Sequence, residues 1–81
     1  MDFPLYTEVI LVQDISEEGV RASDVGVIVE RHEVVGRETG YSVEFFDMLG
    51  NTVAVATVPG SALRVPTQAD RPTVRSEPAS A

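Results

Sequence analysis

The chain has 81 residues, of which six are basic and thirteen are acidic, so its formal net charge at pH 7 is −7. A chain of this length fits one small domain with a marginal core, because it buries only about 60% of its unfolded surface. The sequence contains no cysteine, which excludes disulfide scaffolds, thiol catalysis, iron–sulfur clusters and cysteine-based zinc sites.

The negative charge is unevenly distributed along the chain. Residues 67–81 contain two acidic and two basic side chains, so the whole excess of −7 lies in residues 1–66. A field of this sign repels phosphate backbones and attracts basic proteins. We therefore expect a protein partner with a basic surface and no nucleic-acid partner.

Neither a targeting segment nor a membrane segment is indicated. The first residues, Met1 to Pro4, lack the positive charge that a signal peptide carries. The apolar run from Val9 to Val12 is far shorter than the roughly 18 residues that a membrane span needs. We expect a cytoplasmic protein without a membrane partner.

Short β-strands separated by turn residues are expected along the chain. Valine dominates the apolar side chains, β-branched residues favour strands, and no window repeats with a helical period. The first strand is expected at residues 8–14, followed by a polar loop at 15–23 and a second strand at 27–33. Gly26, just before the second strand, suits a bend or a close backbone approach that a Cβ would obstruct.

The second half of the predicted fold follows a loop at residues 34–40. A third strand at 41–47 and a fourth at 52–58 flank a hairpin turn in which Gly50 is expected to have a positive φ. A 3₁₀ turn at 61–63 then precedes a short closing strand at 64–65. The pattern predicts an all-β fold, a small five-stranded SH3-like barrel that closes to leave no strand edge exposed.

The predicted core consists of apolar side chains from these strands. It comprises Val9, Leu11, Val25, Ile28, Val43, Phe45, Val53, Val55 and Leu63. The barrel is expected to span residues 1–66. From residue 67 onward, proline lies among Ser, Thr, Ala and charged residues, so residues 67–81 are predicted to form a disordered tail.

Three segments carry a distinctive pattern. They are residues 5–11 (LYTEVIL), residues 18–30 (EGVRASDVGVIVE), and the stretch from YSVEF at 41–45 to LR at 63–64. Together they resemble a bacterial family of very short proteins known only as a domain of unknown function, which reads E-x-G-L-x-x-G-D-x-G-x-I-V-E, then Y-x-V-E-F, then L-R. The sequence departs from this pattern at Ser23, where the family usually has glycine, and in a longer loop at residues 33–40.

The resemblance implies an SH3-like barrel without an established activity. The central segment is also similar to the Asp-x-Gly turn of KOW-type modules and to the small barrel of nitrile hydratase β-type subunits. In those proteins the barrel binds or scaffolds and does not catalyse. The resemblance therefore implies a binding or structural role.

The sequence does not indicate a catalytic site. His32 is the single histidine that could activate a serine, and no glycine-rich phosphate loop or lysine is present. Glu30 and His32 share one side of a regular strand, and Glu44 on the neighbouring strand could join them in a weak zinc or nickel site. Ile28 has the same parity and is assigned to the core, so this site needs a twist or bulge. We expect a solvated strand, with no metal, no cofactor and no enzyme activity.

Two surfaces are candidates for binding a protein. Val27, Val29 and Phe46 are expected opposite the predicted core, where they would form an apolar patch. A partner or a second copy of the chain could cover this patch, or the first loop or the N-terminal segment 3–6 could cover it from within. The second surface is acidic and would face a basic partner. It consists of Glu17, Glu18 and Asp24.

The sequence thus predicts a non-enzymatic protein-binding module, of an antitoxin- or immunity-like kind, that uses an acidic barrel surface. The alternative is a structural role, as an accessory subunit of a larger enzyme or as a homo-oligomeric assembly protein built through the apolar patch. An adjacent toxin gene or an adjacent enzyme gene would decide between these hypotheses.

Overall fold

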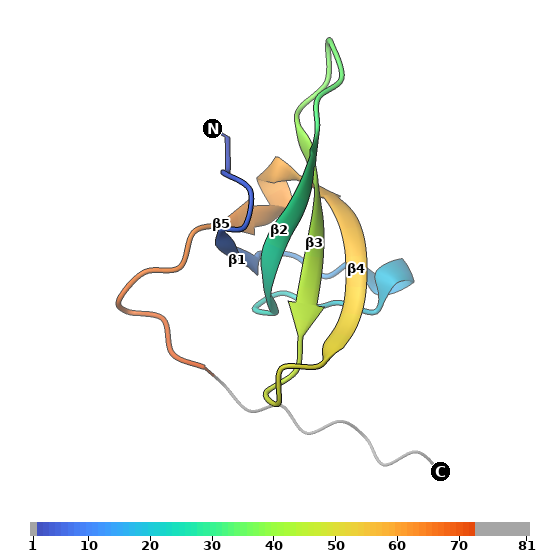
Figure 1. The fold of residues 1–81 in the computed structure, drawn as a ribbon. Coiled ribbons are helices and arrows are strands. Elements are labelled where there is room, and N and C mark those ends of the chain that lie inside the picture. Colours follow the sequence, from blue (N-terminus) through green and yellow to red (C-terminus); the bar gives the residue numbers. More distant parts are fainter. Residues whose placement is uncertain (1, 73–81) are drawn as a thin grey trace.

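Five antiparallel strands form the fold in the computed structural model, which describes residues 2–72. They are β1 (Glu8–Leu11), β2 (Val25–His32), β3 (Gly40–Phe46), β4 (Thr52–Pro59) and β5 (Leu63–Arg64), and two 3₁₀ turns, η1 (Ser16–Glu18) and η2 (Gly60–Ala62), lie between them. The predicted all-β, five-stranded fold with a 3₁₀ turn before the last strand is confirmed, as a curled half-barrel (Figure 1). Within residues 2–72, no helix is long and apolar enough to cross a membrane.

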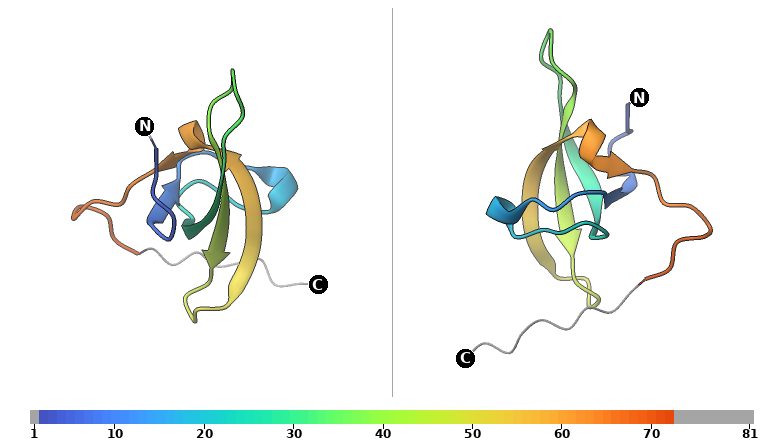
Figure 2. Two further views of the ribbon diagram at one scale, coloured as in Figure 1. Left: turned by 45° about the horizontal axis from the view of Figure 1, so that its top comes forward. Right: turned by 180° about the vertical axis from the view of Figure 1, so that it is seen from behind.

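The strands form one sheet in the order β4-β3-β2-β1-β5, and this sheet curls around the core (Figure 2). In the described part of the chain, β4 and β5 do not pair with each other. The sheet therefore stays open, with β4 and β5 as its two edges, and the predicted closure does not occur. The tail predicted at 67–81 lies largely outside the described residues.

The inner face of the curled sheet holds the core. It consists of Phe3, Val9, Leu11, Val20, Ile28, Tyr41, Val43, Phe45, Ala56, Val58, Ala62 and Leu63. The prediction was right for Val9, Leu11, Ile28, Val43, Phe45 and Leu63, which are all buried. It was wrong for Val25, Val53 and Val55, which are 42%, 60% and 57% exposed.

The packing of β3 against β4 explains the error on β4. The buried side chains of β4 are Ala56 and Val58, which pair with Val43 and Tyr41 of β3. Because β3 fills the interior with large side chains, the facing positions of β4 hold smaller ones. The register also shifts at the end of β3, where β4 carries one extra residue. Val53, Val55 and Thr57 nevertheless share one side of β4, as the alternation of the sequence has them, and that side is exposed. The error therefore concerns which side of β4 faces the core, which alternation alone does not show.

Two glycines have the roles predicted for them. Gly50 has a φ of 85° in the turn between β3 and β4. A Cβ on Gly26 would lie 2.5 Å from Val43 Cγ1 and 2.7 Å from the carbonyl oxygen of Glu44, so β3 approaches β2 closely there. Gly26 therefore faces inward, and its neighbour Val25 points outward, because side chains alternate along a strand.

The N-terminal segment contributes to the core. Phe3 is 6% exposed, and its ring packs edge-on against Tyr41 with the ring centroids 5.4 Å apart. The backbone N–H of Phe3 donates a hydrogen bond to Tyr41 Oη at 3.0 Å. Neither aromatic residue is in the predicted core, because burial of Tyr41 requires a hydrogen-bond partner for its hydroxyl that only this distant segment supplies.

Candidate functional site

The outer face of the sheet carries exposed apolar side chains. Since the inward positions of the sheet form the core, the alternate positions point outward. Five apolar side chains on this face form what we call the outer patch, namely Val25, Val27, Phe46, Val53 and Val55. Val53 lies at the β4 bulge. Phe46, Val53 and Val55 are 39%, 60% and 57% exposed. Neighbouring apolar side chains of this exposure are typical of interaction surfaces.

A row of directly paired residues crosses the outer face from β1 to β4. It reads Glu8, Val27, Glu44 and Val55, so that carboxylates and valines alternate. Glu44 lies between the two valines, and its carboxylate accepts a hydrogen bond from Thr52 Oγ1. The row therefore offers a partner both apolar area and negative charge.

Two arginines of the sheet, Arg31 and Arg64, lie away from this row. Arg31 pairs with Tyr41 in the register of the inner face, and it forms an ion pair with Asp2 at 2.7 Å. Arg64 lies on β5, where it bonds Asp70 through both terminal guanidinium nitrogens. Within residues 2–72, the outward positions of β1 to β4 hold no arginine. This charge pattern is complementary to a basic partner.

A ladder of polar side chains occupies the other end of the outer face. A bulge between Ile28 and Glu30 turns Glu30 and His32 outward. This is the bulge that an outward-facing Glu30 and His32 need, because Ile28 of the same parity is buried. His32 Nε2 lies 2.8 Å from Ser42 Oγ and 3.7 Å from Glu30 Oε1. Ser42 Oγ lies 3.1 Å from Thr57 Oγ1. The ladder thus joins β2, β3 and β4 through side-chain hydrogen bonds.

This ladder has the geometry of neither a catalytic triad nor a metal site. Ser42 is only 9% exposed, and both it and Glu30 approach the same nitrogen of His32, whereas a triad uses the two ring nitrogens separately. Glu44, the third ligand considered from the sequence, bonds Thr52 instead. No three metal-binding side chains gather within the described range, residues 2–72.

The predicted acidic residues fall in two places. Glu17 and Glu18 are exposed on η1, which packs beside β4 (Figure 2). Asp24 directly precedes β2, and its carboxylate accepts a hydrogen bond from the backbone N–H of Arg21 at 2.9 Å. Asp24 therefore shapes the turn into β2, whereas η1 presents its two carboxylates beside β4.

The three apolar residues predicted for the patch all lie on β2 and β3. Val27 and Phe46 belong to the outer patch, and Val29 is half-buried at the bulge of β2. Sequence reasoning missed Val53 and Val55 as surface residues because it assigned them to the core. In the N-terminal segment 3–6, Phe3 packs into the core, whereas Leu5 and Tyr6 are exposed.

Residues 5–65 match the model of a family described as a domain of unknown function, DUF4926. The chain belongs to this family. The matched range contains every strand of the sheet and the whole outer patch. A search of curated proteins and a search of solved structures gave no match. The predicted resemblance to a family of unknown function is thus confirmed.

The turn before β2 contains the one departure from the glycine pattern. Ser23 of this DUF4926 chain has a φ of 81°, in the left-handed region that favours glycine. Its backbone N–H donates a hydrogen bond to the carbonyl oxygen of Leu11 at 2.7 Å. The turn therefore has the backbone conformation of a glycine turn although serine occupies it.

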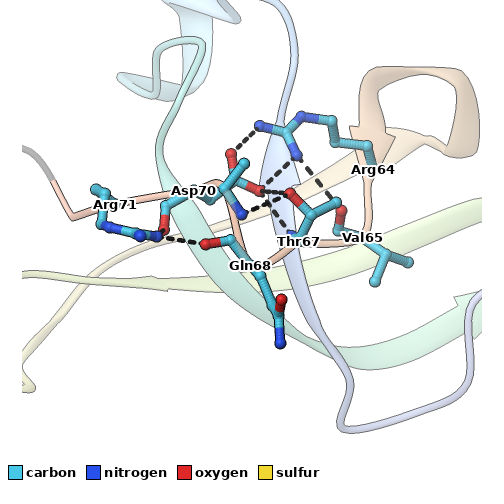
Figure 3. A network of polar contacts seen from close by, with 7 residues as sticks. Arg64, Val65, Thr67, Gln68, Asp70 and Arg71 are labelled. Carbon is cyan, nitrogen blue, oxygen red and sulfur yellow. Dashed lines mark hydrogen bonds and ion pairs between the residues drawn. The ribbon is translucent and has the colours of Figure 1, made fainter.

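A polar clasp holds the segment after β5 (Figure 3). Asp70 accepts hydrogen bonds from the Arg64 guanidinium at 2.7 and 2.9 Å and from the backbone N–H of Thr67 at 2.7 Å. The hydrogen bonds from Arg64 hold the pKa of the Asp70 carboxyl well below its usual range, and they raise the pKa of Arg64. Sequence reasoning missed this clasp because it treated residues 67–81 as one tail.

Proposed function

We propose that this DUF4926 protein is a non-enzymatic protein-binding module that meets a basic partner through its outer face. The observation that best supports this is the row Glu8, Val27, Glu44 and Val55, which alternates carboxylates with valines across four strands. A partner that removes the valines from water gains about 25 cal/mol for each Å² of apolar surface buried. The carboxylates speed and orient the approach of a basic surface.

In its finer form, the proposal is an antitoxin- or immunity-like role in which the domain occludes the basic surface of another protein. The net charge of −7 and the lack of arginine on the outward positions of β1 to β4 support this role. We further propose that the half-barrel is of the SH3-like kind and that the protein is a bacterial protein of the cytoplasm. The five-stranded curled sheet with its 3₁₀ turn before the last strand supports the SH3-like assignment.

Comparative capture from an extract of the source organism tests the proposal. The immobilised wild type is compared with Phe46→Glu in the outer patch and with Val35→Glu as a control. Val35 is fully exposed in the loop between β2 and β3, so the control adds the same charge away from the patch. We expect a basic protein on the wild type and the control at about 50 mM salt, and its loss with Phe46→Glu or at about 500 mM salt. Capture that Phe46→Glu does not change would contradict the proposal.

The exposed outer patch also supports a second candidate function. Val27, Val29 and Phe46 could join two copies of the chain or attach it to a larger enzyme as an accessory subunit. Sedimentation of the purified wild type and of Phe46→Glu distinguishes self-assembly from heterologous binding. Self-assembly predicts a dimer or larger species for the wild type and a monomer for the variant. A monomeric wild type would exclude self-assembly and leave the binding of a different protein.

A further inference from the structure

The outer edge of β4 has unused backbone hydrogen-bonding groups. β4 pairs with β3 along its whole length, and within the described residues no other backbone segment hydrogen-bonds to residues 52–59. In a strand, half of the N–H and C=O groups point to each side, so one side of β4 has no strand partner. An unpaired edge of this kind is a template for an added strand.

The composition of β4 favours such an addition. The run from Thr52 to Leu63 contains no charged residue, and the strand itself reads TVAVATVP. Natural edge strands are usually protected by lysine, proline, bulges, inward charges or a covering helix or loop. Here the bulge lies at the start of β4 and Pro59 lies at its end, so the segment from Ala54 to Val58 has no protecting residue of its own. The turn η1 packs beside the strand, but within residues 2–72 it makes no backbone hydrogen bond to it.

The charges beside this edge indicate which strand it accepts. Glu17 and Glu18 are exposed on η1, and η1 packs beside β4 (Figure 2). A second copy of the chain would bring two more carboxylates to the same edge, and like charges oppose that pairing. A segment with lysine or arginine side chains instead places opposite charges together. Charge complementarity therefore favours a basic segment of another protein over a second copy.

We propose that the free edge of β4 binds an extended, basic segment of a partner protein by strand addition. This proposal rests on the proposed protein-binding function and specifies the form of the partner. Backbone hydrogen bonds to β4 supply the affinity, and the η1 carboxylates select basic side chains. Outward side chains of the added strand lie next to Val55 and Thr57, so the added strand extends the outer patch by one strand.

Amide hydrogen exchange with a designed peptide tests this proposal on the full chain. The probe is a blocked peptide of eight residues that alternates valine and lysine, matching the eight residues of β4. A second peptide has the same sequence with alternate backbone nitrogens methylated, which removes the hydrogen bonds needed for strand pairing. We expect the first peptide to slow exchange at β4 amides and the methylated peptide to leave exchange unchanged.

The charge contribution is tested with matched double variants. Glu17→Gln with Glu18→Gln removes the η1 carboxylates, and we expect about fivefold weaker peptide binding, as two exposed charge pairs would give. Asp2→Asn with Glu33→Gln removes the same charge beside Arg31, away from the outer face, and serves as the control, with binding within about twofold of the wild type. Equal weakening in both double variants would overturn the selective role of η1.

Three further results would overturn strand addition. They are equal binding of the methylated peptide, slowed exchange elsewhere but not at β4, and no binding of either peptide at about 1 mM. Slowed β4 exchange that grows with the concentration of the chain alone would instead identify a second copy as the occupant. If capture depends on Phe46 while the peptide leaves β4 unchanged, the protein-binding function stands and strand addition fails.

Discussion

Phe45 and Phe46 are neighbours in the chain, yet they lie on opposite faces of the same sheet and have different environments. Phe45 is 1% exposed and belongs to the core, whereas Phe46 is 39% exposed and belongs to the outer patch. The same contrast holds for valine on β4, where Val58 is buried and Val55 is exposed. Residue type therefore does not distinguish the side chains that stabilise the fold from those that are available to a partner. Strand register distinguishes them.

The comparison also shows how the two faces treat charge. Every member of the inner cluster is apolar or aromatic, and the one hydroxyl in it, on Tyr41, has a backbone partner. The outer face alternates valine with glutamate along one row. Burying an unpaired carboxylate is costly, so the glutamates keep this row at the surface until a partner supplies opposite charge. The outer face is thus suited to reversible contact and the inner face to permanent packing.

The largest expected difference between the two faces is in the stability cost of truncating the two phenylalanines. Phe45→Ala should lower the free energy of unfolding by about 3–5 kcal/mol, because it opens a cavity in the core. Phe46→Ala should cost about 1 kcal/mol or less, since its side chain is partly solvated in the folded state. Urea denaturation followed by circular dichroism measures both. Equal costs would show that the two faces do not differ as described.

A second test compares a packed glycine with an unpacked one. Gly26→Ala should cost about 1–3 kcal/mol, because the new Cβ overlaps the inner face of β3. Gly36→Ala adds a Cβ with no neighbour within 4 Å, so its cost, about 1 kcal/mol, comes from the positive φ of 81° alone. The same denaturation measurement gives both values. A smaller loss for Gly26→Ala than for Gly36→Ala would refute the close approach of β2 and β3.

The turn that leads into β2 gives a smaller effect of opposite sign. Ser23→Gly should raise the free energy of unfolding by about 0.5–1 kcal/mol, because glycine adopts a φ of 81° without steric strain. The greater flexibility of glycine in the unfolded chain offsets part of this gain. Thermal and urea unfolding of the variant beside the wild type would measure this gain. Destabilisation would indicate that the serine hydroxyl holds the turn.

The smallest expected effect concerns the clasp after β5, which lies outside both faces. Because the pKa of the Asp70 carboxyl is lowered in the folded protein, its contribution to stability is present above the ordinary carboxyl pKa of 3.8 and is lost as the pH falls toward the lowered value. Arg64→Gln should return the pKa of Asp70 toward that ordinary value. A carboxyl titration followed by NMR checks this. An unchanged titration in the variant would show that Arg64 does not hold Asp70.

The sequence predicted the fold class well, because its signals are local. Alternating apolar residues, glycine at turns and a break at Pro59-Gly60 give five strands and the 3₁₀ turn before β5. The faces were harder to predict, because alternation does not show which side of a strand is buried, and because bulges occur in β2 and β4. A bulge has no local sequence signature, and a shift by one residue exchanges the inner and outer sides of a strand.

The candidate site was predicted in part for the same reason. Val27 precedes the bulge of β2, and Phe46 on β3 lies across from the bulge of β4. The alternation of the sequence therefore places both side chains correctly on the outer face. Val53 lies at the β4 bulge and Val55 follows it, and both were assigned to the core because alternation does not show which side of β4 is buried. The clasp between Arg64 and Asp70 joins residues that no periodic pattern connects, so only the folded chain reveals it.

The most direct test of the account maps backbone amide chemical shifts of the isotope-labelled protein during titration with the captured basic partner. The account predicts that the largest changes cluster at outward positions of the sheet, at Val27, Glu44 and Val55, and along β4. Changes confined to the loop between β2 and β3, or to the segment after β5, would contradict the claim that the outer face is the binding surface.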